Sequence, residues 1–198
     1  MIYEALQIIS EQLDKYLSDS GLNNLVVLEN IALLESTNEN ADNLKGKVVL
    51  TLLNLQEESA LRNTPNYKVK DGKTEYRNPP VHLNFYLLIS ANCDTYDKSL
   101  RCLSKTIQFF QGKKVFTSTN TVYNRNNVAF DVLNYFKFIL ELYTLNLEEL
   151  NYVWGTLGGR QLPSVIYKVQ LLEIEQDIKL AASGVITHIG GELNDINQ

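Results

Sequence analysis

The chain has 198 residues, of which 44% are hydrophobic and 21% are charged, a balance typical of a soluble globular protein with one core. A formal net charge of −5 argues against nucleic-acid binding, because such binding depends largely on neutralising phosphates with Lys and Arg. Two cysteines (Cys93, Cys102) and two histidines (His82, His188) match neither a disulfide framework nor a structural zinc site, so we expect reduced thiols and no metal.

The N-terminal segment is predicted to be a helix. Apolar residues recur there at alternating steps of four and three, at Ile2, Leu6, Ile9, Leu13 and Tyr16. Gly21 stands where a C-terminal cap belongs. The segment has Glu4 and Glu11 instead of a basic region followed by an apolar block, so we expect no secretory signal. No run of about 18 apolar residues occurs in the sequence, so we expect no membrane-spanning helix and a protein that is folded in the cytoplasm.

Two strands are expected next, over residues 25–34 and residues 47–55, with a polar loop over residues 35–45 between them. The first is short and rich in Leu and β-branched residues. The second is apolar on both faces, which favours a strand that lies centrally in a sheet or is covered on both sides.

Residues 58–78 are polar and contain YKVKDGKTEY, in which Asp71-Gly72 is a two-residue hairpin signal. The segment is locally basic because, between residues 62 and 77, only Asp71 and Glu75 oppose five cations, namely Arg62, Lys68, Lys70, Lys73 and Arg77. One interpretation is a solvated hairpin. The other is a protruding arm that meets an acidic neighbour.

Pro79 and Pro80 mark the start of a strand over residues 81–90, since proline cannot donate to a sheet. His82 lies on the wetter face of this strand, and we interpret it as structural. Asp94 is expected to be the N-cap of a second helix that ends at Gly112. The predicted buried stripe of this helix comprises Tyr96, Leu100, Leu103, Ile107 and Phe110. Strands over residues 113–118 and 132–145 should follow.

A third helix should begin at Asn146, which forms a variant capping box with Glu149 and is followed by a buried stripe that includes Trp154. After it, GTLGGR at residues 155–160 lacks the lysine and hydroxyl of a phosphate-binding loop. We therefore expect Gly158 and Gly159 to end the helix and Pro163 to direct the next strand, with Arg160 near the helix C-terminus, where the helix dipole favours a cation.

These elements predict an α+β fold, a mostly antiparallel sheet packed by about three helices, with a protruding hairpin arm. We expect one domain over residues 1–182, with the arm inserted at residues 58–78 and an extended tail over residues 183–198. The sequence contains no GxSxG motif, and only His82 and His188 could serve as imidazole bases. We therefore do not expect an enzyme.

Residues 145–169, LNLEELNYVWGTLGGRQLPSVIYKV, resemble the signature of the tail-terminator or cap proteins of contractile injection systems of the antifeeding-prophage and virulence-cassette type. A second matching block is NPPVHLNFYLLISAN at residues 78–92, followed by a helix ending in FFQ and then VF. The blocks agree in order and spacing over nearly the whole chain. Gln170 departs from the pattern, because relatives are expected to carry a basic residue there.

The resemblance implies a tail-terminator-like fold and a non-enzymatic part of a phage tail-like particle that is assembled in the cytoplasm. Such proteins form a hexameric ring that ends the inner tube and anchors the last sheath layer, where strands are exchanged between neighbours. The implied partners are further copies of this chain, the tube protein and the sheath protein, with no cofactor, nucleic acid or membrane insertion. Candidate contact residues are Arg62, Lys68, Lys70, Lys73, Arg77, Arg160 and Lys168.

Two alternatives remain open from the sequence. One is another structural component of the same machine, such as a tube-extending or baseplate-adaptor protein. The other is a small-ligand enzyme that uses the GTLGGR turn.

Overall fold

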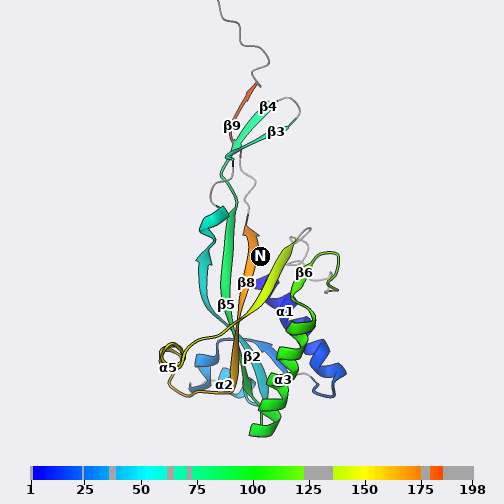
Figure 1. Cartoon of the computed structure of the whole chain (residues 1–198), viewed down its shortest axis with the longest axis vertical. Coiled ribbons are helices and arrows are strands. Elements are labelled where there is room, and N and C mark those ends of the chain that lie inside the picture. The colour runs from blue at the N-terminus through cyan, green and yellow to red at the C-terminus, as the bar shows by residue number, and fades with distance from the viewer. Residues whose placement is uncertain are drawn as a thin grey trace, which may run out of the picture.

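The computed structural model describes residues 2–23, 25–35, 39–61, 65–70, 73–122, 136–174 and 179–184. In Figure 1 the molecule is elongated, with the helices gathered around one sheet and a narrow second sheet projecting from its far end. The long strand β5 (Val81–Asn92) leads from the narrow sheet into the centre of the main one.

The main sheet has six strands in the order β1-β2-β5-β8-β7-β6. Besides β5 it contains β1 (Val26–Leu28), β2 (Lys47–Glu57), β6 (Val115–Thr117), β7 (Lys137–Tyr143) and β8 (Ser164–Ile174). Every pairing is antiparallel except that of β1 with β2. The predicted α+β class with a mostly antiparallel sheet is therefore confirmed.

Helices cover both faces of this sheet. α1 (Ile2–Asp19) and α3 (Tyr96–Gly112) pack on one face over a core that includes Phe85, Phe110 and Phe138. On the other face lie α2 (Glu39–Asn43), α5 (Leu147–Thr156) and the 3₁₀ turn η1 (Ile31–Glu35), around a smaller core. β2 contributes Val48 to the first core and Val49 to the second, as its two apolar faces predict.

The predicted first helix is confirmed. α1 buries one face, and Gly21 follows it with a φ of 83°, a left-handed conformation that glycine adopts without a steric penalty. Its fully buried residues include Ile9, Leu13 and Leu17, each of which contributes on the order of 2 kcal/mol through apolar burial.

The strand expected over residues 25–34 is wrong beyond Leu28. The Asn30 side-chain oxygen accepts a hydrogen bond from Ala32 N–H at 3.0 Å, and Ile31 N–H donates to Thr51 Oγ1 at 3.0 Å. These bonds turn the backbone into η1, a local competition that hydrophobic patterning does not register. The polar loop expected over residues 35–45 also contains the short helix α2.

The buried stripe predicted for α3 is largely wrong. Tyr96, Leu100 and Ile107 are 70%, 41% and 39% exposed, whereas the residues that α3 buries are Ser99, Cys102, Thr106 and Phe110. The Ser99 and Thr106 hydroxyls donate to carbonyls one turn earlier, at 3.2 and 2.9 Å, so these small side chains can be buried with their hydrogen bonds made. The helix therefore presents an apolar stripe outward.

The N-cap of α3 is Thr95, one residue after the predicted Asp94. Asp94 instead accepts a charge-assisted bond from Lys98 Nζ at 3.0 Å.

The projecting sheet has the order β3-β4-β9, from β3 (Tyr67–Lys70), β4 (Lys73–Arg77) and β9 (Lys179–Gly184). The predicted hairpin strands are confirmed, while the Asp71-Gly72 turn itself lies outside the described residues. β9 includes Ser183 and Gly184, the first two residues of the expected tail, and joins the arm as a third strand. We call these three strands the arm.

Candidate functional site

The basic residues predicted for the arm have different surroundings. Lys73 is exposed. Arg77 instead forms a salt bridge of 2.6 Å with Glu75, and the two side chains are only 14% and 8% exposed. Arg62 and the side chains of Lys68 and Lys70 lie outside the described part of the chain. Arg77 is therefore already paired with a carboxylate of its own sheet.

The arm also carries exposed apolar side chains that the sequence pattern did not predict. Tyr67 and Tyr76 stand opposite each other across β3 and β4, and both are exposed, as is Val69 two residues further along β3. Exposed tyrosines are typical of contact surfaces, since they bring large area at a low cost in side-chain entropy. Strand alternation was the available signal, but it could not tell an exposed face from a covered one.

Arg160 and Lys168 lie away from the arm. Arg160 is exposed in the loop after α5, whereas Lys168 is half-buried in the middle of β8, between Tyr86 of β5 and Glu141 of β7. Asn84 Nδ2 donates a hydrogen bond to Glu58 Oε2 at 2.7 Å. This bond, and more weakly the charge of Lys168, lower the pKa of Glu58. The described candidate cations thus form no single patch.

The glycine segment is a structural junction. Glu149 N–H donates to Asn146 Oδ1 at 2.8 Å and Asn146 N–H donates to Glu149 Oε2 at 3.0 Å, which together make a capping box. At the other end of α5, Gly158 and Gly159 have φ values of 109° and 81°.

The return of the chain to the sheet completes this junction. Gly159 N–H donates to Trp154 O at 2.7 Å, and the Pro163 carbonyl accepts from Ala91 N–H of β5 at 2.9 Å. Trp154 is 4% exposed and packs with Val49, Leu88 and Ile166. The segment therefore fixes α5 on the sheet, and the helix N-terminus that could hold an anion lies at the opposite end of α5.

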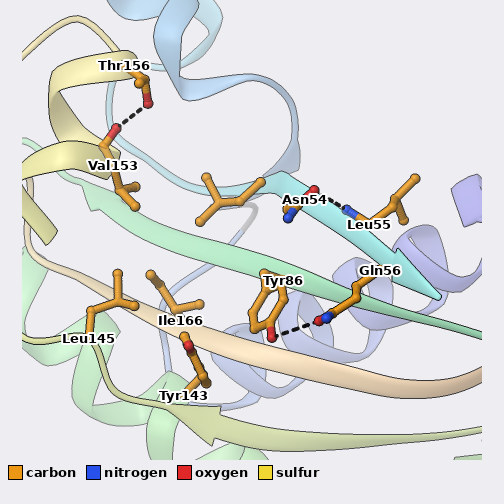
Figure 2. A pocket seen from close by; sticks show the side chains of 10 residues that line it. Asn54, Leu55, Gln56, Tyr86, Tyr143, Leu145, Val153, Thr156 and Ile166 are labelled. Carbon is orange, nitrogen blue, oxygen red and sulfur yellow. Dashed lines mark hydrogen bonds between the residues drawn. The ribbon is translucent and has the colours of Figure 1, made fainter. Parts of the chain in front are cut away.

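The outer edge of β2 is open over residues 52–56, because no described strand pairs there. β1 pairs with β2 only as far as Leu50. Glu58 N–H donates to the His82 carbonyl at 2.8 Å and therefore points toward β5. Along an antiparallel strand, the backbone N–H groups point alternately toward the paired strand and away from it, so the Leu55 N–H points away from β5, toward the open edge. That N–H is bonded by the Asn54 side-chain oxygen at 2.8 Å, as Figure 2 shows. Leu55 is 42% exposed.

A groove of about 570 Å³ adjoins this edge. It is lined by β2, by Tyr86 of β5, by Ile166 of β8, by Tyr143 at the end of β7 and by α5 (Figure 2). The rings of Tyr86 and Tyr143 meet edge to face at 4.9 Å, and Tyr86 Oη lies 3.4 Å from Gln56 Oε1. A second hollow of about 380 Å³ continues along β2 to the end of β1. Together the edge and its hollows can accept an extended chain with side chains on alternate sides.

A third surface lies where β7 runs past β6. β6 pairs with β7 only over residues 137–139, and Leu142 is 56% exposed. A shallow hollow of about 260 Å³ joins this end of β7 to Ile107 of α3 and Leu150 of α5. The outward apolar stripe of α3 therefore continues onto the sheet.

No group of three or more potential metal ligands occurs among the described residues. Burial raises the pKa of Cys102 and of Tyr167 to about 12, and neither lines the groove beside β2. Within the same residues, no helix combines the length and the hydropathy needed to cross a membrane.

The comparisons agree with the resemblance in the sequence. The chain matches the family model of the Pvc16 N-terminal domain over residues 4–188. Its fold is similar to the PVC sheath/tube terminator in the extended state, solved by cryo-electron microscopy as part of an extracellular contractile injection system. That match has 12% identity and a TM-score of 0.63, over 100% of this chain and 64% of that one.

A further match is the tube-terminating cap of the anti-feeding prophage, with 13% identity and a TM-score of 0.61 over 98% of this chain and 62% of that one. The chain thus spans less than two thirds of the length of either solved protein, and at such identities the likeness shows a common fold. A search of curated proteins finds no match. Because the family model covers almost the entire sequence, the chain belongs to the Pvc16 N-terminal domain family.

Proposed function

We propose that this protein is a structural tail terminator of a contractile injection particle, which caps the inner tube and ends the sheath. The observation that carries the proposal is the alignment of the whole chain, arm included, with a sheath/tube terminator. The described residues contain no cluster of three or more potential metal ligands, which is consistent with a structural role. In this proposal the protein needs no cofactor, contacts no nucleic acid and does not insert into a membrane.

Six copies form the ring in this proposal. Ring closure uses heterologous contacts, in which one face of each copy meets a different face of the next. The outward stripe of α3, with Leu142 beside it, supports such a contact because soluble monomers rarely leave a continuous apolar surface uncovered. We assign this stripe to the boundary between neighbouring copies.

The sheath end is held by strand addition at the open edge of β2. A backbone carbonyl of the incoming extended segment replaces the Asn54 side chain as the acceptor of the Leu55 N–H. Alternate side chains of the segment enter the hollows beside the edge. Backbone bonds supply the affinity, and the hollows select the segment. The arm, with Lys73 and the paired tyrosines, reaches a neighbouring subunit or the tube.

Assembly takes place in the cytoplasm, and the finished particle is extracellular or cell-associated. The experiment is a deletion of the gene followed by measurement of particle lengths. A terminator predicts tails of uncontrolled or unstable length, restored to one length by the wild-type gene. A complete lack of tails after deletion would instead identify a baseplate adaptor, and unchanged tails would overturn a role in the particle.

A further inference from the structure

The fold brings together two thiols that the sequence analysis treats as separate. Cys93 directly follows β5 and Cys102 lies on α3, and their Sγ atoms are 3.5 Å apart. Both cysteines are free in the structure; Cys102 is fully buried, whereas Cys93 is partly exposed.

The backbone around the pair is held by neighbouring hydrogen bonds. Cys93 N–H donates to Ser99 Oγ at 3.2 Å, and Ser99 Oγ donates to the Thr95 carbonyl at 3.2 Å. These bonds tie the end of β5 to the first turn of α3. A disulfide needs its sulfurs about 2.05 Å apart, so they would have to approach by about 1.5 Å, a shift within reach of side-chain rotation.

We propose that Cys93 and Cys102 form an intramolecular disulfide when the protein meets low-molecular-weight disulfides, and that the bond locks α3 to β5. The Cys93 thiolate attacks the small disulfide, forms a mixed disulfide and releases one small thiolate. The Cys102 thiolate then attacks Cys93 Sγ and releases the second. The two cysteines lose two protons and two electrons in total, and the small disulfide takes up both to become two thiols.

The order of the steps follows from exposure. Cys93 is the accessible thiol, so the reagent reaches it first. Burial, and then the bond with Cys93, raise the pKa of Cys102 to about 12, against a smaller opposing effect of Lys98, which itself pairs with Asp94. Since only the thiolate attacks, closure of the bond requires Cys102 to lose its proton first.

The consequence for the particle rests on the proposed function, whereas bond formation does not. In a reducing cytoplasm the pair stays open while the ring assembles. In an oxidising exterior the bond fixes α3, and therefore its outward apolar stripe, on the central strand. The cross-link would favour the folded state by restricting the unfolded chain.

The test uses the purified full chain, reduced and then incubated with oxidised glutathione under native conditions. After denaturation and alkylation, the proposal predicts no alkylated cysteine, a mass lower by two hydrogens and a linked Cys93–Cys102 peptide. The melting temperature should rise by a few degrees and return on reduction.

Two variants separate the steps. Cys102→Ser should retain one glutathione on Cys93, whereas Cys93→Ser should remain unmodified because Cys102 is buried. Two alkylatable thiols in the treated wild type, a stable mixed disulfide there, or a disulfide only between two chains would each overturn the proposal. None of these outcomes depends on whether the protein terminates a tail.

Discussion

Trp154 lies in the family signature and also stabilises the fold. It is the only tryptophan in the sequence, and it fills the smaller core between α5 and the sheet. Its indole Nε1 has no hydrogen-bond partner among the described residues, so the ring acts through packing.

Replacing Trp154 with Ala should lower the free energy of unfolding by about 3–5 kcal/mol, as large core truncations do. Trp154→Phe should cost much less, since it keeps a ring and loses a donor that bonds nothing described. Urea denaturation of the three proteins measures both effects. A loss below about 1 kcal/mol for Trp154→Ala would contradict the burial of this side chain.

Single residues also show what sequence reasoning could reach. The Asn146–Glu149 capping box and the role of the glycines after α5 follow local backbone rules, and the geometry matches them. The contact of Cys93 with Cys102 could not be predicted in this way, because it depends on how closely α3 approaches β5. Ser99, Cys102 and Thr106 are among the residues that α3 buries there.

At the level of strands and helices, α1, β2, the arm hairpin and β5 follow from periodicity and turn residues. The buried face of α3 could not be predicted in this way, because the large apolar residues of the helix form a regular stripe that remains exposed in the single chain. A pattern shaped by contacts with another subunit looks the same as one shaped by a core. The third strand of the arm, β9, was also missed, since its pairing with β4 is remote in sequence.

The open edge of β2 allows a test that leaves the fold intact. Leu55→Pro removes an outward N–H that takes no part in the pairing with β5, so the free energy of unfolding should fall by no more than about 1 kcal/mol. Binding of the added strand should be lost, because the proline has no donor to offer. Thermal melts and retention of the sheath on purified particles give the two readouts.

Two controls accompany Leu55→Pro. Leu55→Ala keeps the N–H and should retain the sheath. Gln56→Pro removes an N–H that points toward β5 and should destabilise the fold itself. If Leu55→Pro particles hold their sheaths as wild type does, the strand is added elsewhere.

For the molecule as a whole, an elongated shape places the arm away from the helices (Figure 1). The arm lies at one end and the open edge of β2 runs along one side of the main sheet. The groove beside β2 meets the hollow next to the α3 stripe, since Tyr143, Leu145 and Ile166 line both. In the proposed function, these surfaces let one chain contact a neighbouring copy, an incoming strand and a third partner. A chain with several such surfaces suits the proposed role of ending a tube and a sheath together.

The most direct measurement is electron microscopy of purified particles in which this protein carries a label that is visible in averaged images. A tail terminator should place the label at one tip only, the end distal to the baseplate, arranged with six-fold symmetry. Label distributed along the tail, label at the baseplate, or particles that lack the protein would contradict it.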